Sequence, residues 1–127
     1  MEALHKLAIN EAYNSHKYGE VQVYEWDPLS TASLILYWTS KPAKKVIIKM
    51  KAGHAASNYE DTDYLVLALN NIGVSDTTHK QIKVDVKNGL PFILEGVLIT
   101  QFNIAEVLGY HAVLDTDHDY IDIISYH

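Results

Sequence analysis

Short segments in which apolar and polar residues alternate recur along the chain, as in β-strands that bury one face. The segments 21–26 (VQVYEW) and 82–87 (IKVDVK) follow this alternation. The segment 33–39 (SLILYWT) is apolar on both faces, which predicts a central strand of a sheet. Further on, 110–115 (YHAVLD) and 120–126 (YIDIISY) predict two strands around an acidic turn.

An amphipathic helix is predicted over residues 2–17, with Gly19 as its stop. The apolar stripe of this helix is formed by Leu4, Leu7, Ala8 and Ala12. Its polar side carries Glu2, Lys6, Asn10 and Lys17.

Two further helices are predicted from similar patterns. In 41–52 (KPAKKVIIKMKA), four apolar residues at helical spacing form a stripe, namely Ala43, Val46, Ile47 and Met50. The β-branched run VII in the same segment also fits a strand, which is the alternative. In 103–109, Asn103 and Glu106 match the N-cap and third position of a capping box, and Thr100 is a second possible cap.

The dipeptide Asn88-Gly89 favours a type I′ turn, so the strands on either side of it within 80–99 are expected to pair as a hairpin. The segment 64–70 (YLVLALN) fits a strand or a short buried helix. Together these elements predict one domain over residues 1–127. Its class is α+β, with a mostly antiparallel β-sheet and two or three helices.

The composition is that of a globular protein. The 127 residues are 48% apolar and 20% charged. Their apolar runs are far shorter than the ~20 residues of a membrane span, and the N-terminus lacks the apolar region of a signal peptide. The absence of cysteine excludes disulfides and Cys-ligated metals within the chain and fits a cytoplasmic protein.

Sixteen acidic residues against ten lysines give a net charge of −6, and there is no arginine. Arginine supplies the forks that clamp phosphates and read guanine, so a nucleic-acid partner is not expected. Residues 100–109 (TQFNIAEVLG) match the start of a helix-turn-helix, but an acidic, strand-like stretch follows where the recognition helix belongs. An acidic surface suits a basic protein partner, and we expect one rather than nucleic acid or a membrane.

Three alternating acids, Asp115, Asp117 and Asp119, have the spacing of a calcium loop. Tyr120 stands where such a loop needs glycine, and Tyr126 stands where its bidentate glutamate belongs. Phosphate-binding glycine loops and hydrolase motifs are absent from the sequence. We therefore expect no metal site, no catalytic residues and no cofactor. A metal site formed by these acids with His111, His118 or His127 is the alternative.

The acidic turn and the polar loop before residue 64 are the surface on which we expect a partner to bind. The candidate residues are Asp115, Asp117, Asp119, Asp122, Tyr59, Glu60, Asp61 and Asp63. The tyrosines in polar surroundings, Tyr13, Tyr18, Tyr59 and Tyr126, are expected to be exposed. The aromatic residues of the apolar strands, Tyr24, Trp26, Tyr37 and Trp38, are expected in the core.

The main functional expectation is a small, non-enzymatic inhibitor that blocks a partner by surface contact, as immunity proteins and phage anti-defence proteins do. An alternative is a homo-oligomeric subunit whose edge strands, such as 80–87, pair between copies.

The segment Leu108-Gly109-Tyr110-His111-Ala112-Val113, followed by Asp115 and Asp117, resembles the last helix–strand element of ADP-ribosyltransferase-like proteins. Residues 36–40 (LYWTS) also resemble the aromatic-Thr-Ser strand of that fold. The resemblance implies an enzyme that uses NAD, or an inactive relative of one. It makes Asp117, or else Asp115, the carboxylate that stabilises the cationic sugar. The family's early Arg or His-Gly has no counterpart in this chain.

Overall fold

The computed structural model describes residues 19–28, 30–53, 59, 61–70, 81–107 and 120–127. These residues form eight strands, β1 (Val21–Trp26), β2 (Ser33–Tyr37), β3 (Ala43–Met50), β4 (Tyr64–Leu69), β5 (Ile82–Asp85), β6 (Phe92–Ile99), β7 (Gln101–Val107) and β8 (Ile121–Tyr126). No helix occurs among the described residues, so the predicted α+β class is wrong and this part of the chain is all-β. The predicted helix 2–17 and the predicted strand 110–115 lie outside the described residues.

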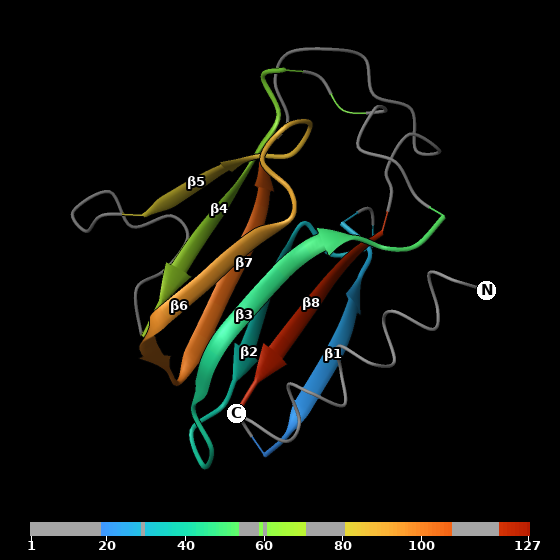
Figure 1. Ribbon diagram of the computed structural model, residues 1–127. Coiled ribbons are helices and arrows are strands. Elements are labelled where there is room, and N and C mark those ends of the chain that lie inside the picture. Colours follow the sequence, from blue (N-terminus) through green and yellow to red (C-terminus); the bar gives the residue numbers. More distant parts are fainter. Residues whose placement is uncertain (1–18, 29, 54–58, 60, 71–80, 108–119) are drawn as a thin grey trace.

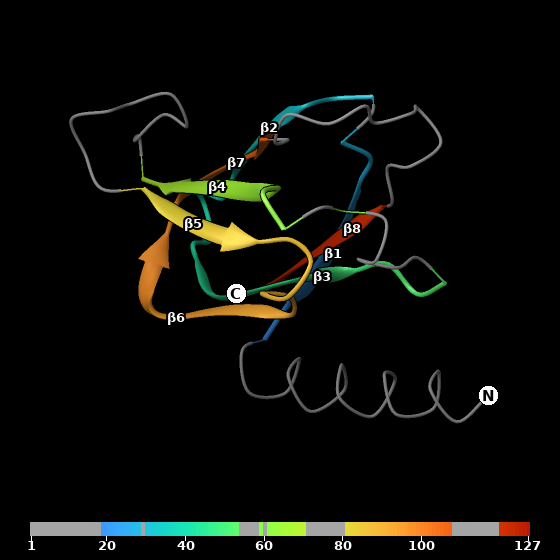
Figure 2. The same ribbon diagram turned by 90° about the horizontal axis from the view of Figure 1, so that it is seen from above.

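The strands form two antiparallel, four-stranded sheets that face each other (Figures 1 and 2). Sheet I has the order β1-β8-β3-β6, and sheet II has the order β2-β7-β4-β5. This is the strand order of a jelly roll. Among the eight strands, β4 and β5 are the one consecutive pair that shares a sheet. Every other connection between consecutive strands leads from one sheet to the other.

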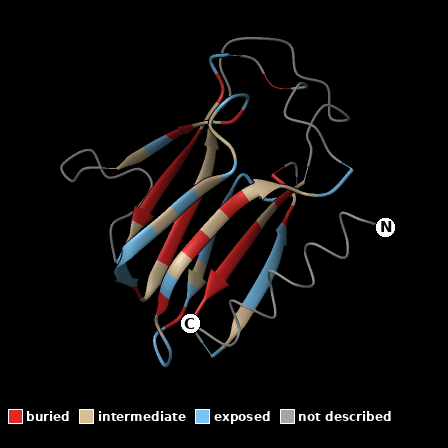
Figure 3. Cartoon of the chain, in the orientation of Figure 1, coloured by how far each residue is buried: buried red, intermediate tan, exposed pale blue. Residues whose placement is uncertain are grey.

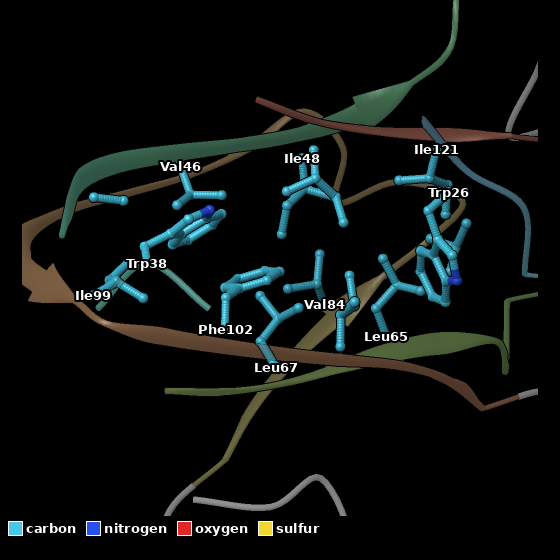
Figure 4. Close-up of a cluster of buried hydrophobic side chains, with 14 of the residues drawn as sticks. Trp26, Trp38, Val46, Ile48, Leu65, Leu67, Val84, Ile99, Phe102 and Ile121 are labelled. Carbon is cyan, nitrogen blue, oxygen red and sulfur yellow. The ribbon is translucent and has the colours of Figure 1, made fainter. Parts of the chain in front are cut away.

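The core lies between the two sheets and is built from the alternate residues of each strand that point inward (Figure 4). Trp26, Ile48 and Ile121 of sheet I meet Leu65 and Phe102 of sheet II, and each is at most 1% exposed. Burial is concentrated on the central strands β3, β8, β4 and β7 (Figure 3).

Residues 43–50 form strand β3, so the helix predicted over 41–52 is wrong. Val46 and Ile48 point into the core and are 0% exposed, whereas Ile47 between them lies on the opposite face. The predicted helical stripe therefore joined residues from two faces of a strand. A short apolar run fits both periods, and here the β-branched residues indicated the correct one.

The helix predicted over 103–109 is also wrong, because residues 101–107 form the strand β7 in the middle of sheet II. Phe102 and Ile104 point into the core. Asn103 is buried on the other face and pairs in register with Ile35 of β2 and Ala68 of β4, so it caps no helix.

The predicted hairpin at Asn88-Gly89 does not form. β5 pairs with β4 in sheet II and β6 pairs with β3 in sheet I, so the chain changes sheets at this turn. Asp85 organises the turn. Its carboxylate accepts a hydrogen bond from the Lys87 N–H (3.1 Å), and its carbonyl accepts one from the Gly89 N–H (2.8 Å).

The strands predicted from alternation at 21–26, 82–87 and 120–126 are confirmed as β1, β5 and β8, and 64–70 is the strand β4. The strand predicted at 33–39 is present as β2, but it is an edge strand rather than a central one. β5 is an edge strand, as expected.

The chain passes from β6 to β7 through a single residue, Thr100. Asn70, directly after β4, holds this corner and has a φ of 55°. Its side-chain oxygen accepts hydrogen bonds from the Thr100 N–H (2.9 Å) and hydroxyl (3.1 Å), and its amide donates to the Leu98 carbonyl (3.0 Å). Asn70 thus connects sheet II to the end of β6 in sheet I. Its backbone is in the left-handed conformation, which asparagine tolerates.

We expect Asn70→Ala to lower the free energy of unfolding by about 1–3 kcal/mol, because the side-chain hydrogen bonds are lost and alanine must adopt a positive φ. Asn70→Gly loses the same bonds without the backbone strain, so it should destabilise less. Urea-induced unfolding of both variants separates the two effects. An Asn70→Ala variant as stable as the unsubstituted chain would contradict this role.

Candidate functional site

Two segments that are distant in sequence, 51–63 and 108–120, are bordered by strands whose ends lie side by side at one end of the sandwich. The segment 51–63 leaves β3 beside the start of β8, and it enters β4 beside the end of β7. The segment 108–120 connects the end of β7 to the start of β8, and both of these strand ends lie at this same end of the sandwich. We call this end, shown at the top of Figure 1, the loop end.

The two segments of the loop end are rich in acids. They carry six of the sixteen acidic residues of the chain, namely Glu60, Asp61, Asp63, Asp115, Asp117 and Asp119, against one lysine, Lys51. Glu60, Asp115, Asp117 and Asp119 lie outside the described residues. The strand register therefore places the strand ends that border the two predicted acidic segments at one end of the protein.

Tyr59 and Asp63, two of the predicted contact residues, are directed into the protein. Tyr59 was expected to be exposed but is 4% exposed and belongs to the core cluster. Its hydroxyl donates a hydrogen bond to the Glu106 carboxylate (2.9 Å), which anchors the segment 51–63 to β7. Asp63 is 1% exposed, and its carbonyl accepts the Val86 N–H. Neither side chain offers contact area on the surface.

Asp61 is the predicted contact residue that the structure shows at the surface of the loop end. Its side chain is 80% exposed and its carboxylate lies 3.5 Å from the Lys87 ammonium, in an exposed ion pair of small energy. Asp122 does not belong to the two segments of the loop end. This residue lies half-buried on β8 between Glu25 of β1 and Lys49 of β3.

A lysine fixes the start of the segment 51–63. The Lys51 ammonium lies 3.0 Å from the Glu25 carboxylate and over the Tyr120 ring, and the Lys51 N–H donates to the Tyr120 carbonyl. The hydrogen bond to Glu25 is the main cause that raises the pKa of Lys51 above its usual value. Lys51 is thus engaged within sheet I, so it does little to offset the acids beyond it.

No protein-family model matches this chain, and no curated protein or solved structure shows significant similarity to it. The resemblance of residues 108–117 to ADP-ribosyltransferase-like proteins therefore stays a prediction, as does the role of Asp117 or Asp115 in it. Within the described residues, no group of three or more His, Asp or Glu side chains could hold a metal ion. In the same part of the chain, no helix is long and apolar enough to span a membrane.

Several large apolar residues are exposed, which the sequence pattern did not predict. They lie on the edge strands β1, β2 and β6, as Val23, Tyr24, Ile35, Tyr37, Ile93, Val97 and Leu98. Tyr24 and Tyr37 were expected in the core but are 43% and 65% exposed, whereas Tyr126 was expected at the surface and is 1% exposed. The signal was present in segments such as SLILYW, where apolar residues occupy both faces.

We expect Tyr59→Phe to lower the free energy of unfolding by about 1 kcal/mol, because the ring stays in the core and one hydrogen bond is lost. Tyr59→Ala should cost about 3–5 kcal/mol, as for other large buried side chains. The matched control is Tyr24→Phe, at a 43% exposed tyrosine, where little change is expected. Chemical unfolding measures all three, and equal effects of the two Phe substitutions would argue against the anchoring role.

Proposed function

We propose that this protein is a small, non-enzymatic binding protein that inhibits or regulates a basic protein partner by surface contact at the loop end. The proposed mode of action is that of an immunity protein or an anti-defence inhibitor. In this mode of action, the rigid protein covers a basic groove of its partner and neutralises the charge of that groove. We propose that the protein acts in the cytoplasm and needs no cofactor.

The observation that carries this proposal is the shared anchoring of two acidic segments at one end of the sandwich. The pairings of β3 with β8 and of β4 with β7 set the ends of 51–63 and 108–120 next to each other. Loops that are held by a rigid sheet framework are common sites of binding in β-sandwich proteins. The framework anchors both acidic segments at the same end of the protein, which supports the proposal.

The charge of the loop end favours a basic partner. Apart from the buried Asp63, its two segments contribute five acids and one lysine, and Asp61, the described exposed acid among them, lies at the surface. A concentrated negative potential speeds the encounter with a positive surface and disfavours acidic partners. Because exposed charges are screened by salt, such binding should weaken steeply as ionic strength rises.

The test is a double variant that neutralises one acid in each segment, Asp61→Asn with Asp117→Asn. We expect about tenfold weaker capture of the partner from extract of the source cells at low salt, equivalent to ~1.4 kcal/mol. The captured proteins are quantified by mass spectrometry at low and high salt. The partner is the protein whose capture by the unsubstituted chain depends on salt.

The matched control is Glu20→Gln with Glu95→Gln, at a partly exposed acid directly before β1 and an exposed acid on β6, which form ion pairs with Lys41 and Lys45. Both double variants change the net charge of −6 by the same two units, so a difference between them reports position rather than total charge. If the two variants lose capture equally, or if capture does not depend on salt, the loop end is not the contact surface.

A further inference from the structure

The outer face of sheet I, which points away from the core, carries a row of four aliphatic residues. The register places Val23 of β1 beside Ile124 of β8, Ile124 beside Ile47 of β3, and Ile47 beside Ile93 of β6. We call these four residues the outer row. It crosses every strand of the sheet.

The middle of the outer row is buried although it lies outside the core. Val23 and Ile93, at the two ends of the row, are 53% and 52% exposed, whereas Ile124 in the middle is 4% exposed. Tyr126, on the same face of β8, is 1% exposed. Neither Ile124 nor Tyr126 belongs to the core cluster between the sheets. Apolar residues thus continue across a face of sheet I that the opposite sheet does not cover.

Charged residues border the outer row on both sides. Towards one end of the strands, Lys45 lies 3.9 Å from Glu95, and towards the other end, Lys51 lies 3.0 Å from Glu25. An apolar strip between charged borders matches an amphipathic helix, whose apolar stripe is flanked by polar residues.

The segment that precedes sheet I has this pattern and a suitable length. Residues 2–17 are predicted to form an amphipathic helix with Leu4, Leu7, Ala8 and Ala12 on its apolar side. Sixteen residues in a helix extend about 24 Å. Four strands spaced by ~4.8 Å span about 15 Å, so the segment is long enough to lie across the whole outer row.

The structure fixes the point at which this segment joins sheet I. Glu20, directly before β1, accepts the His127 N–H at its carbonyl (2.9 Å), and its carboxylate lies 3.4 Å from the Lys41 ammonium. His127 is 1% exposed, and its Nδ1 lies 2.6 Å from the Lys41 carbonyl oxygen. Gly19 has a φ of 90°, which lets the chain change direction at this corner. A segment tethered here has a high effective concentration at the outer face.

We infer that residues 2–17 fold as an amphipathic helix that covers the outer row of sheet I in the same copy of the chain. This inference concerns sheet I and stands independently of the proposed function at the loop end.

A single spin label tests this inference in the full-length protein. The chain has no cysteine, so Lys6→Cys, on the polar side of the segment, gives one attachment site. We expect the label to broaden the methyl resonances of Ile47 and Ile124 strongly while those of Ile35, on the outer face of sheet II, keep their intensity. Loss of intensity at Ile35 to the same degree, or none at Ile47 and Ile124, would overturn the inference.

Two further samples identify the occupant. Leu7→Asp in the labelled protein should abolish the broadening, whereas Asn10→Asp, which adds the same charge on the polar side, should leave it in place. A mixture of isotope-labelled protein without the spin label and spin-labelled protein without isotope should show no broadening. Broadening in that mixture would place the segment on a second copy of the chain and refute docking within one copy. Equal effects of the two Asp substitutions would likewise refute docking through the apolar stripe.

Discussion

The contact between the inner faces of the two sheets is the interaction on which the rest of the structure depends. Apart from β4 and β5, consecutive strands belong to different sheets, so no ladder of backbone hydrogen bonds joins them to each other. Side chains such as Trp26 and Phe102 must meet across the core before the order of the strands has any stability. Polar contacts such as that of Asn70 with the β6–β7 corner then hold the margins of the sandwich.

Local patterns predicted the strands that bury one face, because alternation is a direct consequence of the pleat. They failed where two periods fit the same residues. In 41–52, apolar residues satisfy a helical stripe, but pairing of β3 with both β6 and β8 stabilises the strand. Asn88-Gly89 has the composition of a hairpin turn, yet its flanking strands find partners elsewhere in the chain. Both outcomes depend on contacts between distant residues, which override local propensity.

The candidate site was predictable in its charge but not in its assembly. The acids of 51–63 and 108–120 are evident in the sequence, whereas their shared end of the sandwich follows from the pairings of β3 with β8 and β4 with β7. Tyr59 shows the same limit at the level of one residue. Its polar neighbours predicted exposure, but its hydroxyl binds Glu106, 47 residues further along the chain. The sequence pattern alone could not identify that partner.

The position of β8 has a consequence for biosynthesis. This strand follows all other described strands along the chain, yet it lies between β1 and β3 in the middle of sheet I. A growing chain therefore cannot close sheet I until the residues of β8 have left the ribosome, so the pairing of β1 and β3 with β8 is a late step in the folding of the sandwich. A truncated chain that ends before residue 121 would expose the unpaired edges of β1 and β3 to other chains, so it would be prone to aggregation and proteolysis.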